Sequence, residues 1–281
     1  MTSKAIEDLK RLKEKNEPFF LACGYARPHL PFNAPKRFWD LYDRDEIKIP
    51  DNYYRPKDAP DVALHNFGEL RAYHNIPAQG PVSDETALFL IHGYYASTSF
   101  VDYEIGRLME TLDDLELRDS TIIILWGDHG WQLGEHAIWC KHSNFETSTH
   151  VPLLINAPGY KKNNRSNALV EFVDIYPTLC ELVGLPLPAH LQGTSFVPLL
   201  SDPDVPWKQA AFSRWYNGWS LRTDRYRYTE WRNETGQITD RMLYDHNIDP
   251  DENVNISEKT DKRVLVNRLS YMLQKGWQAY Q

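Results

Sequence analysis

Apolar residues recur every three or four positions between residues 3 and 16, which predicts an amphipathic helix capped by Ser3. Its inner face would carry Ile6, Leu9 and Leu12. Pro18 ends the helix, because proline disfavours helical backbone at the residue before it. The run 19–25 is largely apolar and is bounded by turn residues, so it predicts a short buried strand.

The next stretch, to about residue 82, is rich in proline. We expect irregular structure there, with one short helix over residues 36–42, and such loop-rich stretches often form binding surfaces. Apolar residues at helical spacing return between Ser83 and Leu115 and predict a long helix. Ser83 can cap this helix, and Asp84 lies in its first turn, where the helix dipole favours an acidic group.

Strands and helices alternate in the middle of the chain. The run 121–126 predicts a central strand, and the run 151–155 predicts a second one. Residues 171–183 predict a helix that ends at a glycine. This alternation is typical of a layered α/β domain, which we expect over residues 1–204.

The tail has a different pattern, in which short apolar runs are separated by turn residues. Strands are expected at 213–216, 220–224, 226–231 and 242–244. A last helix over residues 262–274 would carry Val264, Leu265, Leu269 and Met272 on one side. We therefore expect a smaller α+β subdomain over residues 205–281, built from an antiparallel sheet and a helix.

Composition excludes several classes of protein. The 281 residues carry a formal net charge of −8, which argues against a nucleic-acid partner, since such proteins carry a basic stripe. No apolar run is long enough to cross a membrane, and no secretory signal is present in these residues. The three cysteines, Cys23, Cys140 and Cys180, are too widely spaced to form a disulfide framework.

The candidate chemistry begins at the end of the strand predicted over 121–126. Asp128 and His129 follow it directly, at the sheet edge where ligands bind in open α/β sheets, and Gly127 and Gly130 allow a sharp turn. An adjacent carboxylate and imidazole can both bind one divalent metal ion. A solvated or structural Asp-His pair is the alternative. A zinc site is another, built from the residues His129, His136, Cys140 and His142, although their spacing matches no zinc module.

Two further residues could bind an anion. Lys141 stands beside Trp139 and Cys140, and an ammonium near a metal site suggests a sulfate or phosphate ligand, although a lone lysine is usually solvated. His29 follows the first predicted strand, where we expect Pro28 and Pro31 to keep its backbone extended. A histidine bonded only to backbone is the alternative there.

An ordered set of motifs resembles the type I sulfatase family. The residues 24–32 are similar to the G-Y-x-x-P-H-x-P-F segment of that family, and residues 127–136 to its G-D-H-G-W-x-L-G-E-H segment. Further similar segments follow at 139–145, 149–153, 173–179, 193–200, 220–228 and 243–245. Within the family, the runs around Trp131 and Lys141 most resemble the iduronate-2-sulfatases. The resemblance covers nearly the whole chain.

The resemblance implies an alkaline-phosphatase-like α/β sandwich and hydrolysis of a sulfate ester on a sulfated saccharide. It implies that Asp128 and His129 bind a calcium ion, and that Lys141 and His29 bind the sulfate and assist the departing oxygen. It places Trp131 beside the sugar, although an aromatic residue of the core or of a lid is an equal alternative. Electrostatic stabilisation of the leaving oxygen and a proton from histidine agree with this chemistry.

The sequence also departs from the family. The nucleophile of the family is a formylglycine made from the cysteine of C-x-P-x-R, and none of the three cysteines stands in that motif. We therefore expect a fold without its N-terminal portion, a fragment or split subunit that a complementary N-terminal sulfatase chain could complete. A phosphoester hydrolase of the same superfamily, or a non-catalytic remnant that binds sulfated glycans, are the alternatives. The family is usually exported, and the sequence leaves the compartment open.

Overall fold

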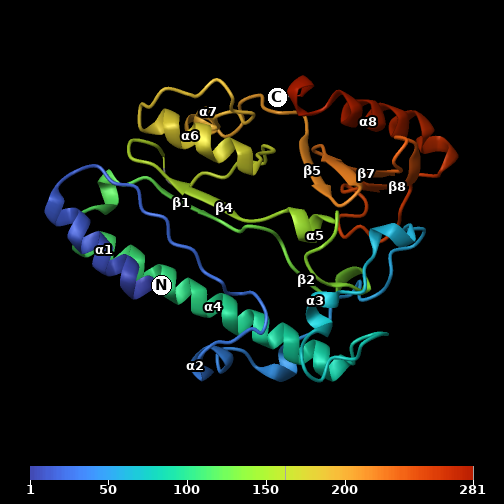
Figure 1. Cartoon of the computed structure of the whole chain (residues 1–281), viewed down its shortest axis with the longest axis horizontal. Coiled ribbons are helices and arrows are strands. Elements are labelled where there is room, and N and C mark those ends of the chain that lie inside the picture. The colour runs from blue at the N-terminus through green and yellow to red at the C-terminus, as the bar shows by residue number, and fades with distance from the viewer. Residues whose placement is uncertain (162, 281) are drawn as a thin grey trace. The chain divides into compact units, whose positions relative to one another are not determined.

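A computed structural model describes residues 1–161 and 163–280 of the chain (Figure 1). The chain divides into two compact units. The first comprises Met1–Tyr53 and Gly68–Ile122, and the second comprises Tyr54–Phe67 and Ile123–Gln281. The domain boundary expected at residue 205 lies within the second unit and stays a prediction.

The first unit is helical. Its α-helices are α1 (Thr2–Lys15), α2 (Lys36–Trp39), α3 (Gly68–Arg71) and α4 (Asp84–Asp114), with 3₁₀ turns at Arg44–Glu46 and Arg118–Ser120. Both α1 and α2 pack on α4. The hydroxyl of Ser83 accepts a hydrogen bond from Thr86 N at 3.4 Å, which confirms the predicted cap of the long helix. In the part of the chain that the structure describes, no helix is apolar enough over a sufficient length to cross a membrane.

Three expectations for the first unit are wrong. Helix α1 begins at Thr2, so Ser3 lies inside it and the capping residue is Met1. Residues 19–25 form no strand, and Phe20 is 82% exposed. An apolar run becomes a strand only where a neighbouring strand takes its backbone hydrogen bonds. The backbone around His29 is not extended either, because His29 N and Phe32 N close consecutive turns.

The second unit begins with two small antiparallel pairs. Strand β1 (Ile123–Trp126) pairs with β4 (Leu153–Asn156), and β2 (Gln132–Leu133) pairs with β3 (Trp139–Cys140). The strand predicted over 121–126 is therefore present, but it is not central. Among residues 1–161 and 163–280 it pairs with β4 alone, and the outer face of the pair exposes Leu125 and its partner Leu154.

The inner face of the β1–β4 pair is covered by helices. The helix predicted over 171–183 is present as a 3₁₀ turn, Phe172–Asp174, that continues into α6 (Ile175–Leu182). Ile175 lies in a buried cluster against which Ile124 and Ile155 pack. The second unit also contains the short helices α5 (Glu146–Thr149) and α7 (Val197–Ser201) and a 3₁₀ turn at Asp61–Ala63.

The tail confirms the predicted antiparallel sheet. Its strands are β5 (Ala211–Trp215), β6 (Gly218–Arg222), β7 (Tyr226–Arg232) and β8 (Ile238–Asp245), in that spatial order. Helix α8 (Arg263–Lys275) packs on one face of the sheet, around buried residues such as Leu221 and Leu269 (Figure 1). One expected core residue is misplaced: Val264 is 81% exposed, and Val266 takes the buried position.

Candidate functional site

The turn after β1 is held against the segment that precedes β4. Gly127 N donates to Pro152 O at 3.2 Å, and Gly130 N donates to Ser148 O at 2.9 Å. A Cβ atom at Gly130 would overlap the carbonyl group of Thr147. Only glycine allows this close approach of two backbones, so the position of the intervening residues is fixed from both ends.

The two residues inside this turn direct their polar atoms toward one place. His129 Nδ1 lies 2.7 Å from Gly130 O. A carbonyl oxygen only accepts, so Nδ1 carries the proton and Nε2 of the neutral ring is left as an acceptor. His129 Nε2 lies 3.5 Å from Asp128 Oδ2, and the Asp128 side chain is 87% exposed. The pair therefore presents one nitrogen and one oxygen toward solvent.

This arrangement fits a divalent cation. Two ligand atoms that bind one ion at about 2.0–2.6 Å are necessarily a few ångströms apart, as Nε2 and Oδ2 are here. The two residues supply two donors only, whereas calcium takes about six to eight. The remaining ligands would have to come from water, from the substrate or from other protein groups.

Two more of the predicted residues adjoin this pair. The rings of His129 and Trp131 stack with their centroids 6.0 Å apart, and Lys141 Nζ lies 4.9 Å from the centroid of Trp131. Just before Lys141, Cys140 has a φ of 73°, a value uncommon outside glycine and typical of constrained sites. The structure thus brings Asp128, His129, Trp131 and Lys141 into one chain of contacts.

His29 belongs to the first unit and has its own partners there. Its Nε2 lies 2.7 Å from Glu69 Oε1, and its Nδ1 lies 2.9 Å from Leu30 O. Both ring nitrogens therefore face oxygens that accept hydrogen bonds and cannot donate them. The carboxylate of Glu69 orients the ring, and this contact could not be predicted because the two residues lie forty positions apart.

The alternative zinc site is wrong, because its residues are engaged separately. His136 is buried, stacks on Phe145 at 4.1 Å and has Nε2 2.9 Å from Asp251 O. The ring of His142 stacks on Trp215 at 4.8 Å. Among residues 1–161 and 163–280, the one group of three or more metal-binding side chains is Glu146, His246 and Glu252.

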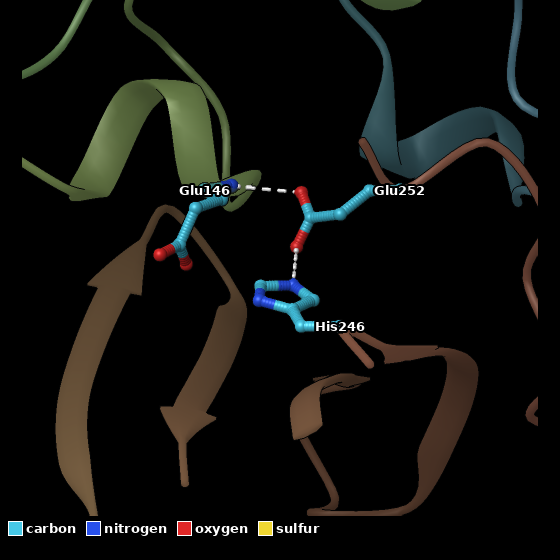
Figure 2. A group of neighbouring side chains, drawn as sticks. All are labelled: Glu146, His246 and Glu252. Atoms are coloured by element: carbon cyan, nitrogen blue, oxygen red, sulfur yellow. Dashed lines mark hydrogen bonds and ion pairs between the residues drawn. The ribbon is translucent and has the colours of Figure 1, made fainter. Parts of the chain in front are cut away.

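That group of three was missed by the sequence reasoning, because its members come from distant segments. Figure 2 shows Glu252 between the backbone of Glu146 and the ring of His246. One carboxylate oxygen of Glu252 accepts from Glu146 N at 2.8 Å, and the other lies 3.0 Å from His246 Nε2. These bonds fasten α5, which follows the Lys141 loop, to the segment after β8.

The same group does not fit a metal ion, because cations of the protein already bind its carboxylates. Arg227 Nε lies 3.1 Å from Glu252 Oε1, and its Nη2 contacts Glu146 Oε2. Arg222 Nε lies 3.3 Å from Glu146 Oε2, and His150 Nδ1 lies 3.2 Å from Glu146 Oε1. A metal ion would have to displace arginine, so we interpret this cluster as a structural ion-pair network.

Comparison with known proteins gives the context for this geometry. The Sulfatase family matches residues 1–185, and the family described as N-sulphoglucosamine sulphohydrolase, C-terminal, matches residues 134–278. Human iduronate 2-sulfatase is 32% identical to this chain over an alignment that covers 82% of this chain and 55% of that protein. The chain therefore spans about half the length of the curated relatives it matches.

Solved structures show the same fold. A protein in complex with its substrate D-glucosamine-2-N,6-O-disulfate matches with a TM-score of 0.82 and 22% identity, over 98% of this chain and 68% of that one. A phosphonate monoester hydrolase from Silicibacter pomeroyi matches with a TM-score of 0.83 and 25% identity, over 100% of this chain and 59% of that one. The fold is the α/β fold of the alkaline-phosphatase-like hydrolases, and the chain belongs to the sulfatase family.

Proposed function

We propose that this chain carries part of the apparatus that hydrolyses a sulfate ester on a sulfated saccharide. The observation that supports this most is the convergence of His129 Nε2 and Asp128 Oδ2, with the ammonium of Lys141 joined to the pair through Trp131. Metal ligands beside a fixed cation suit a substrate with a compact anionic group. The names of the relatives, with iduronate 2-sulfatase among them, support a sugar as the carrier of that group.

In this proposal Asp128 and His129 bind a calcium ion together with ligands from outside this pair. When bound there, such an ion would supply positive charge beside the sulfate oxygens and would lower the barrier to cleavage. Gly127 and Gly130 keep both ligands in place, because each end of their turn is bonded to the segment before β4.

Lys141 binds a non-bridging sulfate oxygen as a point charge, and Trp131 supports its ammonium and contacts the sugar. For His29, the resemblance to the sulfatases supports a role in binding the sulfate and in assisting the departing oxygen. The carboxylate of Glu69, bonded to His29 Nε2, orients its ring.

Hydrolysis also needs a nucleophile, and C-x-P-x-R is absent from the 281 residues. We propose that a sulfatase segment outside these residues supplies a formylglycine and further metal ligands, either on the same polypeptide or on a complementary chain. The exposed outer face of the β1–β4 pair, with Leu125 and Leu154, supports this proposal, because apolar residues on a sheet face are normally covered by another layer.

The test is reconstitution. The chain is produced together with a sulfatase segment that bears C-x-P-x-R, formylglycine is verified by mass spectrometry, and release of sulfate from sulfated disaccharides is measured. We expect activity that falls at least about a hundredfold in Asp128→Ala and in Lys141→Ala. The proposal is overturned if the verified pair is inactive, or if both variants keep full activity.

A phosphoester or phosphonate ester is the second candidate substrate. Phosphonate monoester hydrolases are among the structures with this fold, at 25% and 26% identity. The reconstituted pair is therefore also assayed with a phosphonate monoester. Faster turnover of that substrate than of the sulfated disaccharides would favour the second candidate.

A further inference from the structure

The hairpin between β5 and β6 is fastened beside the loop that carries Lys141. Trp215 N donates a hydrogen bond to Asn144 Oδ1 at 3.2 Å. Across the hairpin, a Cβ atom at Gly218 would overlap the amide nitrogen of Asn144. The tip of the hairpin is therefore seated against a residue that lies three positions after Lys141, and Asn144 itself is buried.

Side-chain stacking extends this contact to the surface. The rings of His142 and Trp215 lie 4.8 Å apart at 30° to each other, and His65 meets His142 edge-on at 6.0 Å. The Trp215 side chain packs on one face and remains 44% exposed. The result is an indole whose orientation is fixed but whose surface reaches solvent.

This indole is linked to the candidate site through the chain, because it stacks on His142 in the loop that carries Lys141. His129, Trp131 and Lys141 form a series of ring and cation contacts, and His142 is the next residue after Lys141. Aromatic faces bury the apolar C–H face of a sugar ring at small entropic cost, because the rings are already held in place.

We propose that Trp215, positioned by His142 and Asn144, forms a subsite for a carbohydrate ring of the sulfated substrate. The inference rests on the proposed function, since it assigns a specificity-determining residue to the same site. It adds that recognition of the sugar, as distinct from recognition of the sulfate, depends on the C-terminal sheet.

The neighbouring Trp219 provides a matched control. It lies in the same hairpin and is 42% exposed, but its cross-strand partner is Arg214, whereas that of Trp215 is Gly218. Side chains at adjacent positions of a strand point to opposite faces of the sheet. Trp219 therefore shares the face of Leu221, on which α8 packs, and its ring is covered by Arg214 at 4.2 Å.

The test compares two ligands by calorimetry on the full chain and, where the reconstituted pair forms, on that pair. Inorganic sulfate probes the Lys141 site alone, and a heparin-derived tetrasaccharide probes the site with the added subsite. We expect Trp215→Leu to weaken tetrasaccharide binding about tenfold and to leave sulfate binding unchanged. Trp215→Tyr should retain most of the affinity, Trp219→Leu should change it less than twofold, and Lys141→Ala should weaken both ligands.

The outcomes separate the two proposals. The subsite is overturned if Trp215→Leu binds the tetrasaccharide as tightly as wild type, or if Trp219→Leu weakens tetrasaccharide binding as much as Trp215→Leu does. In either case, weaker binding by Lys141→Ala would still support the proposed function. If neither ligand binds, or if Lys141→Ala has no effect, the proposed function fails and the subsite fails with it. Thermal melting of each variant identifies a loss of affinity that comes from unfolding.

Discussion

Lys208 Nζ lies 2.7 Å from Asp174 Oδ1, and both side chains are buried. A second carboxylate, from Glu171, lies 3.0 Å from the same ammonium. Asp174 is the residue before α6, and Lys208 precedes β5, so this ion pair joins the helix under the β1–β4 pair to the start of the C-terminal sheet. A buried cluster of charges therefore helps to hold α6 and the first strand of the C-terminal sheet together.

Replacement of the lysine should be strongly destabilising. Lys208→Met leaves two carboxylates without their cation in the interior, and we expect a loss of about 3–5 kcal/mol in the free energy of unfolding. Urea denaturation at pH 7 measures this loss. Lys259→Met, at an exposed position, is the control and should change stability by less than about 0.5 kcal/mol. Equal effects of the two substitutions would contradict the role given to the buried pair.

The second network makes stability depend on pH. Burial by itself would raise the pKa of Glu146, but the hydrogen bond from His150 and the charges of Arg227 and Arg222 outweigh it, so the pKa lies well below the ordinary 4.5. A lowered pKa in the folded state contributes stability that is fully present above the unfolded pKa and is lost as the pH falls below it. We therefore expect the contribution of Glu146 to decline from about pH 5 downward.

The variant Glu146→Gln isolates this contribution. Between pH 5 and pH 3 the wild type should lose about 2 kcal/mol more stability than the variant, since each pH unit below the unfolded pKa is worth about 1.4 kcal/mol. Glu258→Gln, at a carboxylate whose side chain is 77% exposed, should leave the wild-type pH profile unchanged. Parallel profiles for wild type and Glu146→Gln would show that the network carries no such linkage.

The turn that holds Asp128 and His129 depends on glycine. Gly130→Ala forces a methyl group onto the backbone of Thr147, and we expect a loss of about 1–3 kcal/mol in stability together with weaker cation binding. Gly106→Ala is the control, because nothing lies within 4 Å of its Cβ position in α4 and alanine favours helix. The control should be neutral or stabilising by up to about 1 kcal/mol. A Gly130→Ala protein as stable as wild type would contradict the close packing of this turn.

Elements defined by local signals could be predicted from the sequence. The cap at Ser83, the periodicity of α4 and the turn residues around β5–β8 all act over a few positions, and the structure confirms them. The strand predicted over 19–25 was wrong, because a strand needs a neighbouring strand and the periodicity of one segment does not reveal whether it has one. Val264 and Val266 are two positions apart, and pattern alone did not decide which faces the sheet.

The contacts in and around the candidate site also fall into those that the sequence could predict and those that it could not. Asp128, His129 and Lys141 lie within fourteen consecutive residues, so sequence position was enough to group them, and the resemblance to the sulfatases added Trp131. Glu146 and Glu252 come from segments more than a hundred residues apart, and the contact between Trp215 and His142 joins a loop to a distant hairpin. Such pairings arise when the C-terminal sheet packs on the loop, so they cannot be predicted from any single stretch of the sequence.

Terbium luminescence tests the central claim, that Asp128 and His129 together bind a cation of the calcium type, most directly. Terbium takes the oxygen ligands that calcium takes, and Trp131, stacked on His129, is placed to sensitise its emission. We predict sensitised emission that calcium competes away, that is lost in Asp128→Ala and in His129→Ala, and that persists in Asp224→Ala, an exposed carboxylate elsewhere in the second unit. The measurement is made on the chain alone and on the reconstituted pair; emission that is unchanged in Asp128→Ala, or absent from the wild-type pair, would contradict the account.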